Sequence, residues 1–251
     1  MIYEKLTKVS IITPLFNSEN YILNTFKSII GQTYPNWEWI VVDDNSTDSS
    51  FDIVKELAEC DDRVVLLRNL NNEGAGASRN KAIRKASGRY IAFLDADDEW
   101  CLNKLEKQIS FMLKNDYEFT YTQYQKFSNA GYLSVVVPPD NVNYNQLLYS
   151  NVIGCLTVVY DTYKLGKRYM PLIRKRQDMG LWLSILKDVP KAYCLQENLA
   201  KYRVDSGMTK NKISVLNYQW RFYREVVGLS FFRSAYTFLV YAYKGFIKSR
   251  I

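Results

Sequence analysis

Three closely spaced carboxylates follow an apolar run near the middle of the chain. Asp95, Asp97 and Asp98 come directly after Tyr90 to Leu94. Carboxylates this close repel one another unless a cation lies between them. Mg²⁺ and Mn²⁺ prefer such oxygen ligands, and a bound cation could neutralise a diphosphate and make it a better leaving group. A plain acidic turn is the alternative, and its weakness is the strongly apolar strand that runs into the cluster.

The 251-residue chain contains no histidine. This excludes histidine-based acid–base catalysis, the serine and cysteine triads that need a histidine, and histidine metal sites. Proton transfer must then fall to a carboxylate, Lys, Tyr or Cys. The four cysteines are scattered and form no CxxC pair, which favours a reducing cytosol over a disulfide framework.

The first hundred residues alternate short apolar runs with helix-like segments, and this pattern positions the polar groups. We expect strands at 9–13, 37–42, 63–67 and 90–94, with helices at 20–32, 46–60 and 76–87. Such alternation predicts an α/β fold with a mostly parallel, doubly wound sheet. Ligands bind such sheets at the carboxyl ends of the strands. Thr13, Asp43, Asp44 and the Asp95–Asp98 cluster all follow strands, so we expect them at one edge.

The pattern loosens beyond Asn115. Strands are expected at 119–124, 132–137 and 155–160, and helices at 177–187 and within 216–251. We therefore predict one domain at 1–212, divided at residue 115 where the pattern changes, followed by a basic, aromatic helical segment at 213–251. Residues 1–6 are too polar for a signal peptide, and no run approaches the roughly 18 apolar residues of a membrane span.

The segment Gly74-Ala75-Gly76-Ala77-Ser78-Arg79 opens the third helix and nearly matches the dinucleotide fingerprint G-x-G-x-x-G. Arg79 stands where the third glycine belongs, and the segment follows the third strand instead of the first. An NAD-binding interpretation is therefore weak, although this helix start could help to position a phosphate or a ribose.

Several motifs in order resemble family 2 glycosyltransferases. They are Val9 to Asn17 (VSIITPLFN), Val41 to Asp48 (VVDDNSTD), Asn72 to Asn80 (NEGAGASRN) and the aspartate motif at Phe93 to Trp100. The resemblance is strong over roughly residues 7–110. It implies a GT-A fold, an inverting mechanism, and a UDP-sugar or similar nucleotide-sugar donor. It also implies that 1–212 is the glycosyltransferase domain, with a nucleotide-sugar-binding half at 1–115 and an acceptor half at 116–212.

The resemblance also assigns roles to individual positions. It implies that Thr13, Leu15 and Glu19 line the nucleoside pocket, that Asp44 bonds the base, and that Asp43 supports its loop. Arg79 is expected near the donor and Asp95 near the ribose or sugar. Asp97 and Asp98 are expected near a Mn²⁺ or Mg²⁺ ion, and the sequence does not decide which of the two binds it directly.

The segment Arg176-Gln177-Asp178-Met179-Gly180-Leu181-Trp182 resembles the family's Glu-Asp-x-Asp-x-Trp motif, which supplies the catalytic base. Gln177 and Gly180 replace two of its carboxylates, so Asp178 is the expected base. Trp182 lies at i+4 on the same helix face and could pack beside the carboxylate or under an acceptor sugar. Alternatively, Asp178 only occupies the first turn of a helix, where the dipole favours it.

The segment from Tyr202 to Gly207 resembles a late segment of the family, in which some relatives place a histidine near the metal or diphosphate and this chain has Asp205. Arg203 could contact the diphosphate, and an extra metal ligand at Asp205 is a further possibility.

The net charge is unevenly distributed along the chain. Residues 1–140 carry 15 Lys or Arg against 20 Asp or Glu, whereas residues 141–251 carry 18 against 6. Eleven of the 36 residues from Leu216 to Ile251 are aromatic, and six are basic. Such a segment suits the surface of an anionic membrane, or a helix that packs its aromatic residues on the domain. The resemblance favours a membrane, because many such transferases use polyprenyl-diphosphate carriers.

The predicted function is sugar transfer to a saccharide or a polyprenyl-diphosphate-linked acceptor in surface polysaccharide synthesis. The protein is expected in the cytoplasm, peripheral on the inner face of the cytoplasmic membrane. Two alternatives are a non-catalytic nucleotide-sugar-binding protein and another nucleotide-dependent enzyme, such as a nucleotidyltransferase. No nucleic-acid recognition motif is present.

Overall fold

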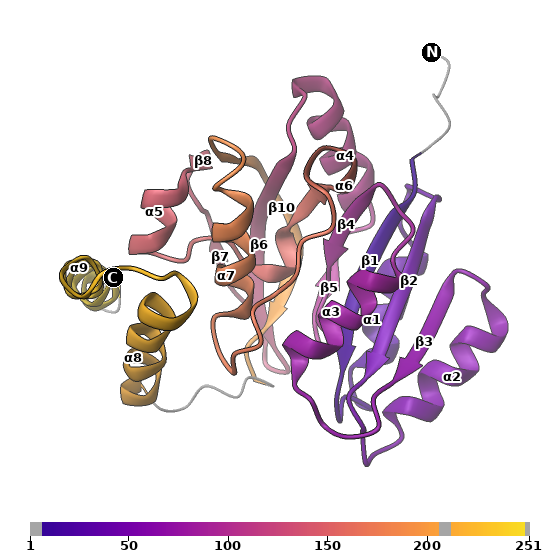
Figure 1. Cartoon of the computed structure of the whole chain (residues 1–251). Helices are drawn as coiled ribbons and strands as arrows, with labels where there is room; N and C mark the ends of the chain where they lie inside the picture. Colours follow the sequence, from indigo (N-terminus) through magenta and orange to yellow (C-terminus); the bar gives the residue numbers. More distant parts are fainter. Residues whose placement is uncertain (1–6, 206–211, 249–251) are drawn as a thin grey trace.

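The computed structural model describes residues 7–205 and 212–248. Residues 1–6, for which we expected no signal peptide, lie outside this part, as do 206–211 and 249–251. The described chain forms a mixed sheet covered by helices on both faces, which confirms the predicted α/β class (Figure 1).

Within the described residues the sheet has ten strands. They are β1 (Val9–Leu15), β2 (Trp37–Asp43), β3 (Val64–Arg68), β4 (Tyr90–Phe93), β5 (Glu99–Trp100), β6 (Phe119–Ser128), β7 (Gly131–Val136), β8 (Asn141–Val142), β9 (Val159–Asp161) and β10 (Ala192–Arg203). The order is β3-β2-β1-β4-β9-β6-β10-β5, with β7 beside β6 and β8 beside β10. Strands β1 to β4 are parallel, β9 is antiparallel to β4 and β6, and β10 is parallel to β6.

The strand order reverses at β1, which pairs with β2 on one side and with β4 on the other. In open α/β sheets ligands bind beside this switch point, outside the carboxyl ends of the strands. In Figure 1, β1 and β2 run down from the N-terminus, so these ends lie at the lower edge of the sheet. The loops after β1, β2 and β4 therefore meet where a ligand is expected.

Two apolar cores fill the two faces of the sheet, because successive strand side chains point to opposite faces. One core joins Ile11 and Val41 to the helices α1 (Ile22–Ile30), α2 (Ser50–Cys60) and α4 (Lys104–Asn115). The other joins Ile12 and Val42 to α3 (Ala75–Lys85), α5 (Tyr144–Tyr149) and α7 (Gln177–Ile185). The helices expected in the first hundred residues are thus present, and they hold the sheet from both sides.

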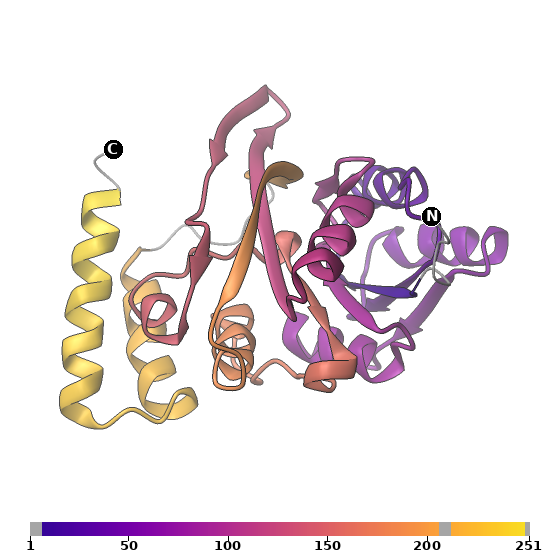
Figure 2. The ribbon, with the colours of Figure 1, turned by 90° about the horizontal axis from the view of Figure 1, so that it is seen from above.

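The C-terminal segment forms α8 (Lys212–Arg221), a π-helical turn η2 (Phe222–Val226) and α9 (Phe231–Lys248). Gly228 has φ of +74°, a conformation that favours glycine, in the turn before α9. Figures 1 and 2 show α8 and α9 side by side at the edge of the molecule farthest from α2 and β3. Among residues 7–205 and 212–248, no helix has the length and apolarity that a membrane span requires.

Two features of the second half differ from the sequence prediction. The apolar run 155–160 was expected to be one strand, but residues Cys155–Thr157 form a 3₁₀ turn, and only β9 pairs with the sheet. Strand β10, the long partner of β6, was not predicted. Its polar stretch Gln196-Glu197-Asn198 lies at irregularities in the pairing, so the alternation of a regular strand is lost. Apolar patterning therefore located the buried strands and missed the irregular one.

Lys104 begins α4 with a side chain that is fully buried. Its Nζ donates a hydrogen bond of 2.8 Å to Gln108 Oε1 and lies 4.1 Å from the centre of the Trp100 ring. No carboxylate pairs with it among the described residues, and burial lowers the pKa of this amine from 10.5 to about 7. A charged ammonium group is costly at this position.

Lys104 is therefore expected to make stability pH-dependent. Between pH 7 and 10.5 the unfolded chain holds a proton at this position that the folded chain lacks, so its contribution to stability rises with pH. Replacing Lys104 with Met should remove a slope of up to about 1.4 kcal/mol per pH unit. Urea unfolding at pH 7, 8 and 9 measures this slope, with Lys114→Met, an exposed lysine on the same helix, as the control. Identical slopes in wild type and K104M would contradict the prediction.

Candidate active site

The acidic loop Asp95–Asp98 connects β4 with β5 and is fixed by hydrogen bonds to its backbone. Thr25 of α1 donates its hydroxyl hydrogen towards the carbonyl oxygens of Ala96 (3.0 Å) and Asp98 (2.9 Å). From β10, the backbone N–H of Arg203 donates to Asp98 Oδ1 at 2.9 Å, and Arg203 Nε donates to the Asp97 carbonyl at 3.2 Å. The loop is therefore held rigidly at the sheet edge.

The three carboxylates of this loop lie in different environments. Asp95 forms an ion pair of 2.5 Å with Arg79, and Asp97 is partly exposed. Asp98 is only 2% exposed, and its Oδ1 accepts the N–H of Arg203. Burial raises the pKa of Asp98 well above its usual value, and the charges of Asp97 and Asp95 raise it further. Asp97 is thus partly exposed, whereas Asp98 is buried and Asp95 is held by Arg79.

The donor set suits Mg²⁺ or Mn²⁺ only when another ligand completes it. Among the described residues, no group of three or more Asp, Glu or Cys side chains could enclose a metal ion. Mg²⁺ typically uses one or two protein carboxylates together with substrate phosphates. An accessible Asp97 beside a second, mutually repelling carboxylate fits that pattern.

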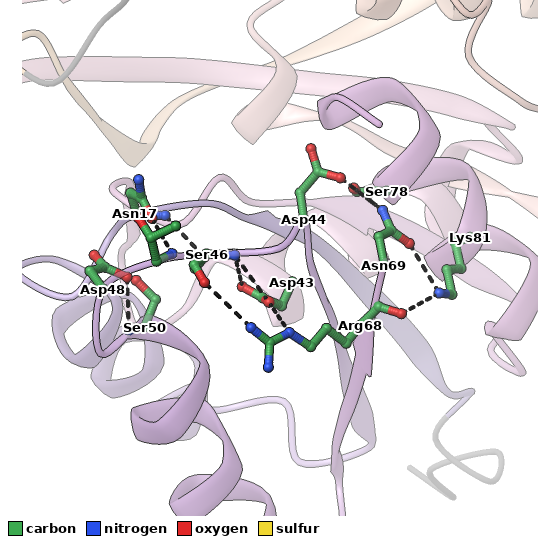
Figure 3. A network of polar contacts seen from close by, with 11 residues as sticks. Asn17, Asp43, Asp44, Ser46, Asp48, Ser50, Arg68, Asn69, Ser78 and Lys81 are labelled. Atoms are coloured by element: carbon green, nitrogen blue, oxygen red, sulfur yellow. Dashed lines mark hydrogen bonds and ion pairs between the residues drawn. The ribbon is translucent and has the colours of Figure 1, made fainter. Parts of the chain in front are cut away.

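A polar network surrounds the carboxyl end of β2 (Figure 3). Asp43 is fully buried, accepts the N–H of Ser46 and pairs with Arg68 at 3.1 Å. Asp44 accepts hydrogen bonds from Asn69 Nδ2 (2.8 Å) and from the backbone N–H groups of residues 73 (2.9 Å) and 74 (2.8 Å). Asp43 thus contacts the loop after β2, while Asp44 joins β2 to the start of α3.

Thr13 and Leu15 lie in β1 with no exposed side-chain surface. Thr13 donates to the Leu94 carbonyl at 2.6 Å and accepts from the Trp39 indole at 2.8 Å. A nucleoside could therefore reach these positions only through the backbone, not through the side chains. Glu19 is exposed, and it accepts the N–H of Ser49 at 2.9 Å, so it fastens the loop after β2.

The start of α3 does not leave a dinucleotide site open. The N–H groups of Glu73 and Gly74, which would face a pyrophosphate, both donate to Asp44. Gly76 lies close to α7, because a Cβ atom there would lie 2.8 Å from the end of the Gln177 side chain. Gly76 thus lies at the contact between α3 and α7, and the NAD interpretation has no support in this geometry.

Arg79 connects the two expected catalytic regions. Its guanidinium is nearly buried, pairs with Asp95 and donates to Gln177 Oε1 at 3.4 Å. Burial alone would lower the pKa of Arg79, but the nearby charges of Asp95 and Asp178 raise it above its ordinary value. The acidic loop and the start of α7 therefore lie on either side of one arginine.

Asp178 is in the first turn of α7 and is partly exposed. Its Oδ2 accepts a hydrogen bond of 3.3 Å from Asn151 Nδ2. Cys155 lies among Arg79, Asp95 and Asp178, and burial raises the pKa of its thiol well above 9.0. A thiol that stays protonated is a poor base, so Asp178 remains the candidate base among these groups. The four cysteines of the chain are all free.

Trp182 does not face an acceptor in this structure. Its ring is fully buried, with its centre 5.4 Å from that of Phe93 and 5.5 Å from that of Phe119. The expectation that it could stack under a sugar is corrected here, because no face of the ring is open. It packs α7 against β4 and β6, and thereby supports Asp178 from the core.

Gly180 occupies a position where the family motif has a second carboxylate. A Cβ atom there would lie 2.5 Å from Pro171 Cγ and 2.9 Å from Pro171 Cδ, distances at which the proline ring must move. The loop before α7 therefore packs where that side chain would be.

Restoring this carboxylate should destabilise the fold. Gly180→Asp is expected to lower the free energy of unfolding by about 1–3 kcal/mol through overpacking. The matched control is Gly245→Ala on α9, where a Cβ atom meets nothing within 4 Å. The higher helix propensity of alanine should raise the free energy of unfolding of this variant by about 0.5–1 kcal/mol. Chemical denaturation measures both, and a G180D protein as stable as wild type would contradict the proposed clash.

Arg203 lies close to the acidic loop but is nearly buried. Its guanidinium donates to Asn129 Oδ1 at 3.0 Å and lies 4.6 Å from the centre of the Tyr21 ring. It supports the loop, so direct contact with a diphosphate would require this packing to open. Asp205 is exposed and accepts the N–H of Asn129 at 2.9 Å, and this hydrogen bond lowers the pKa of its carboxyl group.

Three supporting residues were missed by the sequence analysis. Thr25 fixes the acidic loop, Asn69 bridges Asp44 and Ser78, and Asn151 contacts Asp178. Thr25 lies within an ordinary helix pattern and Asn151 in an irregular segment, so neither carries a local signal. Asn69 follows a predicted strand, as Asp43 does, and its position at a strand end could have identified it as a candidate site residue.

Polar groups gathered at the carboxyl ends of β1, β2 and β4, beside a switch point, define a nucleotide-binding α/β enzyme. The chain belongs to glycosyltransferase family 2, because the model of "Glycosyl transferase family 2" matches residues 10–169. It is therefore a glycosyltransferase.

Relatives agree with this assignment. TuaG of Bacillus subtilis, named as a teichuronic acid biosynthesis glycosyltransferase, is 40% identical over 246 residues, covering 97% of each chain. The Escherichia coli UDP-Glc:alpha-D-GlcNAc-diphosphoundecaprenol beta-1,3-glucosyltransferase WfgD is 44% identical and covers 84% of this chain and 83% of its own. The crystal structure of S. aureus TarS 1-349 with UDP-GlcNAc matches with a TM-score of 0.72 at 20% identity, covering 94% of this chain and 71% of that one. The last match confirms the GT-A fold.

Proposed function

We propose that this protein is a metal-dependent, inverting glycosyltransferase that moves a sugar from a UDP-sugar to a lipid-diphosphate-linked saccharide. The observation that carries the proposal is the position of Arg79, between Asp95 of the acidic loop and the turn that bears Asp178. A donor held by the loop would thus present its sugar near a carboxylate base. The substrates follow the names of the relatives, which include a UDP-Glc transferase acting on GlcNAc-diphosphoundecaprenol.

Inverting transfer needs one base on the acceptor side. The acceptor hydroxyl attacks the anomeric carbon from the face opposite the diphosphate, the bond to UDP breaks, and Asp178 takes the hydroxyl proton. Asn151 orients the Asp178 carboxylate through its hydrogen bond. Arg79 holds Asp95 in place for the ribose or sugar of the donor.

The metal would be held by Asp97 directly, with Asp98 supporting the loop. Asp98 is buried and its carboxylate accepts the Arg203 N–H, whereas Asp97 is partly exposed. When bound, Mg²⁺ or Mn²⁺ supplies charge neutralisation to the diphosphate leaving group. Asp44 and the backbone of β1 would contact the nucleoside.

The direct test combines donor binding with transfer. UDP-glucose and related nucleotide sugars are added with Mn²⁺ or with EDTA, and thermal shift and sugar transfer to a GlcNAc-diphospholipid are measured. Stabilisation by UDP that requires Mn²⁺, together with a β-linked product, supports the proposal. Stabilisation without transfer to any acceptor would favour a non-catalytic binding protein, and an α-linked product would refute inversion.

We further propose a peripheral contact with the inner face of the cytoplasmic membrane through residues 216–251. Helix α9 buries the small polar side chains of Ser234 and Thr237 and exposes an apolar stripe. The stripe consists of Phe232, Tyr236, Leu239 and Tyr243, each 60–84% exposed. Their spacing of four, three and four residues places them on one helix face. Arg233 lies exposed beside the stripe, which suits an anionic lipid surface.

Removing this stripe should release the protein from vesicles. The double variant Phe232→Ser/Leu239→Ser is expected to reduce flotation with phosphatidylglycerol-containing liposomes by at least about tenfold, because burial of two large apolar side chains is lost. The matched control is Tyr163→Ser/Leu70→Ser, two exposed side chains far from α9. Equal flotation of the two double variants would show that the stripe is not the membrane contact.

A further inference from the structure

A groove of about 340 Å³ lies between the loop that precedes α7 and the helical segments α8 and η2. Basic and apolar side chains line it together, namely Arg174, Lys175, Arg221, Leu172, Ile173 and Val226. We propose that this groove binds the lipid-diphosphate part of the acceptor, with the phosphates at Arg174 and Lys175 and the first isoprene units along the apolar side chains. The inference rests on the proposed function for the nature of the acceptor.

The positive charge of the groove is concentrated on the loop side. Arg221 is neutralised by Glu225, with two hydrogen bonds of 2.9 and 3.0 Å. Arg174 is exposed and makes no hydrogen bond or ion pair within residues 7–205 and 212–248, and Lys175 Nζ lies 5.0 Å from the centre of the Tyr218 ring. A diphosphate would thus meet two adjacent cations, with arginine able to bind its oxygens in a bidentate manner.

The apolar part of the groove is unusual for a site that binds only an anion. Leu172 is 76% exposed, although it lies next to Pro171, which packs closely against Gly180. Ile173 and Val226 pack against the main core from the edge. An isoprenoid chain would cover this surface, whereas an inorganic anion would leave it in water.

The groove adjoins the expected base. Its loop leads into α7, which begins one residue before Asp178, and Gln177 donates its amide N–H to the Ile173 carbonyl. On the opposite wall, a ring carbon of Phe222 lies 3.4 Å from the Cβ position of Gly180. The loop that lines the groove is therefore tied to the turn that bears Asp178.

Helix α9 packs beside the elements that form the groove. Arg176 donates a hydrogen bond to the Tyr241 hydroxyl, and Trp220 of α8 packs edge-on against Phe231 and Phe238 of α9. Figures 1 and 2 show these two helices together at the edge of the molecule. A carrier lipid could then leave a membrane at α9 and reach the groove without crossing the sheet.

Direct binding of farnesyl diphosphate to the full chain tests the groove without any turnover. Equilibrium dialysis is done with saturating UDP and Mn²⁺, so that the donor site is occupied. Arg174→Ser/Lys175→Ser should weaken binding at least about tenfold, as the loss of two charge-assisted contacts implies. Lys55→Ser/Lys114→Ser, exposed lysines on α2 and α4, is the matched control and should bind within about twofold of wild type. Equal affinity of the groove variant and wild type for farnesyl diphosphate would overturn the proposal. It would also be overturned if wild type bound inorganic diphosphate as tightly as farnesyl diphosphate.

Steady-state kinetics separates this inference from the proposed function. In the groove variant, KM for a lipid-diphosphate acceptor should rise about tenfold, while KM for the donor and its hydrolysis by water stay unchanged. The rate of sugar transfer to a saccharide acceptor that lacks a diphosphate should be the same in the groove variant and in wild type. A complete lack of transfer by wild type would refute the proposed function, whereas the dialysis experiment would still decide the groove.

Discussion

Asp178→Asn should reduce sugar transfer by about 10²–10⁴-fold, because the amide cannot take the acceptor proton. The side chain keeps its size, so the contact with Asn151 and the packing of α7 should persist. The loss should appear in kcat, with little change in the KM for the donor. Steady-state kinetics with a saturating acceptor measures both parameters.

The matched control is Asp188→Asn, just beyond the C-terminal end of the same helix. Asp188 is partly exposed and pairs with Arg168 at 2.7 Å, away from Arg79 and the acidic loop. Its replacement should leave kcat within about twofold of the wild-type value, because an exposed ion pair contributes little. If D178N transferred sugar at a rate near that of wild type, Asp178 would be a helix-terminal residue and not the base.

Asp97→Asn should reduce metal-stimulated transfer by about two to three orders of magnitude. An amide is a much weaker ligand than a carboxylate for Mn²⁺, and stabilisation of the leaving diphosphate is worth several kcal/mol. The stabilisation of the fold by UDP with Mn²⁺ should be lost as well. A thermal shift with UDP, in the presence of Mn²⁺ or EDTA, therefore gives a readout that is independent of turnover.

Asp98→Asn discriminates between the two aspartates. Its Oδ1 accepts the Arg203 N–H, and an asparagine oxygen can accept the same bond, so we expect a smaller loss, below about tenfold. Asp62→Asn, an exposed position in the turn after α2, serves as the neutral control. If D98N abolished the Mn²⁺ response and D97N retained it, the assignment of the direct ligand would be reversed.

The sequence predicted the first half of the fold well, for a physical reason. Strands such as Ile11–Ile12 and Ile40–Val42 are buried on both faces, so they read as uninterrupted apolar runs between polar loops. The same rule placed Asp43, Asp44 and Asp95 at the carboxyl ends of strands, and the structure brings those ends to one edge. The roles of these residues in binding and catalysis stay predictions, as do the domain boundaries at 115 and 212.

The second half could not be predicted as fully, because its contacts are made between distant segments. Pairing of β10 with β6 depends on irregularities at Leu195 and Asn198 that no local pattern reveals. The i, i+4 spacing of Asp178 and Trp182 suggested a shared exposed face, but the large ring is drawn into the core by Phe93 and Phe119. The spacing of residues along a helix shows which side chains share a face. Only the tertiary fold decides which part of that face is covered by other segments.

The pairing of β4 and β5 limits how this enzyme can be divided or recombined. The acidic loop lies between them, and β4 pairs with β9 while β5 pairs with β10, both from the second half of the chain. A fragment that ends at Asn115 would lack both partners, so its loop would have no fixed shape and the edge of β4 would be bare. Hybrid enzymes with altered acceptor choice are therefore better joined at the start of α8 than between the two halves, because a junction there leaves the interlocked sheet intact.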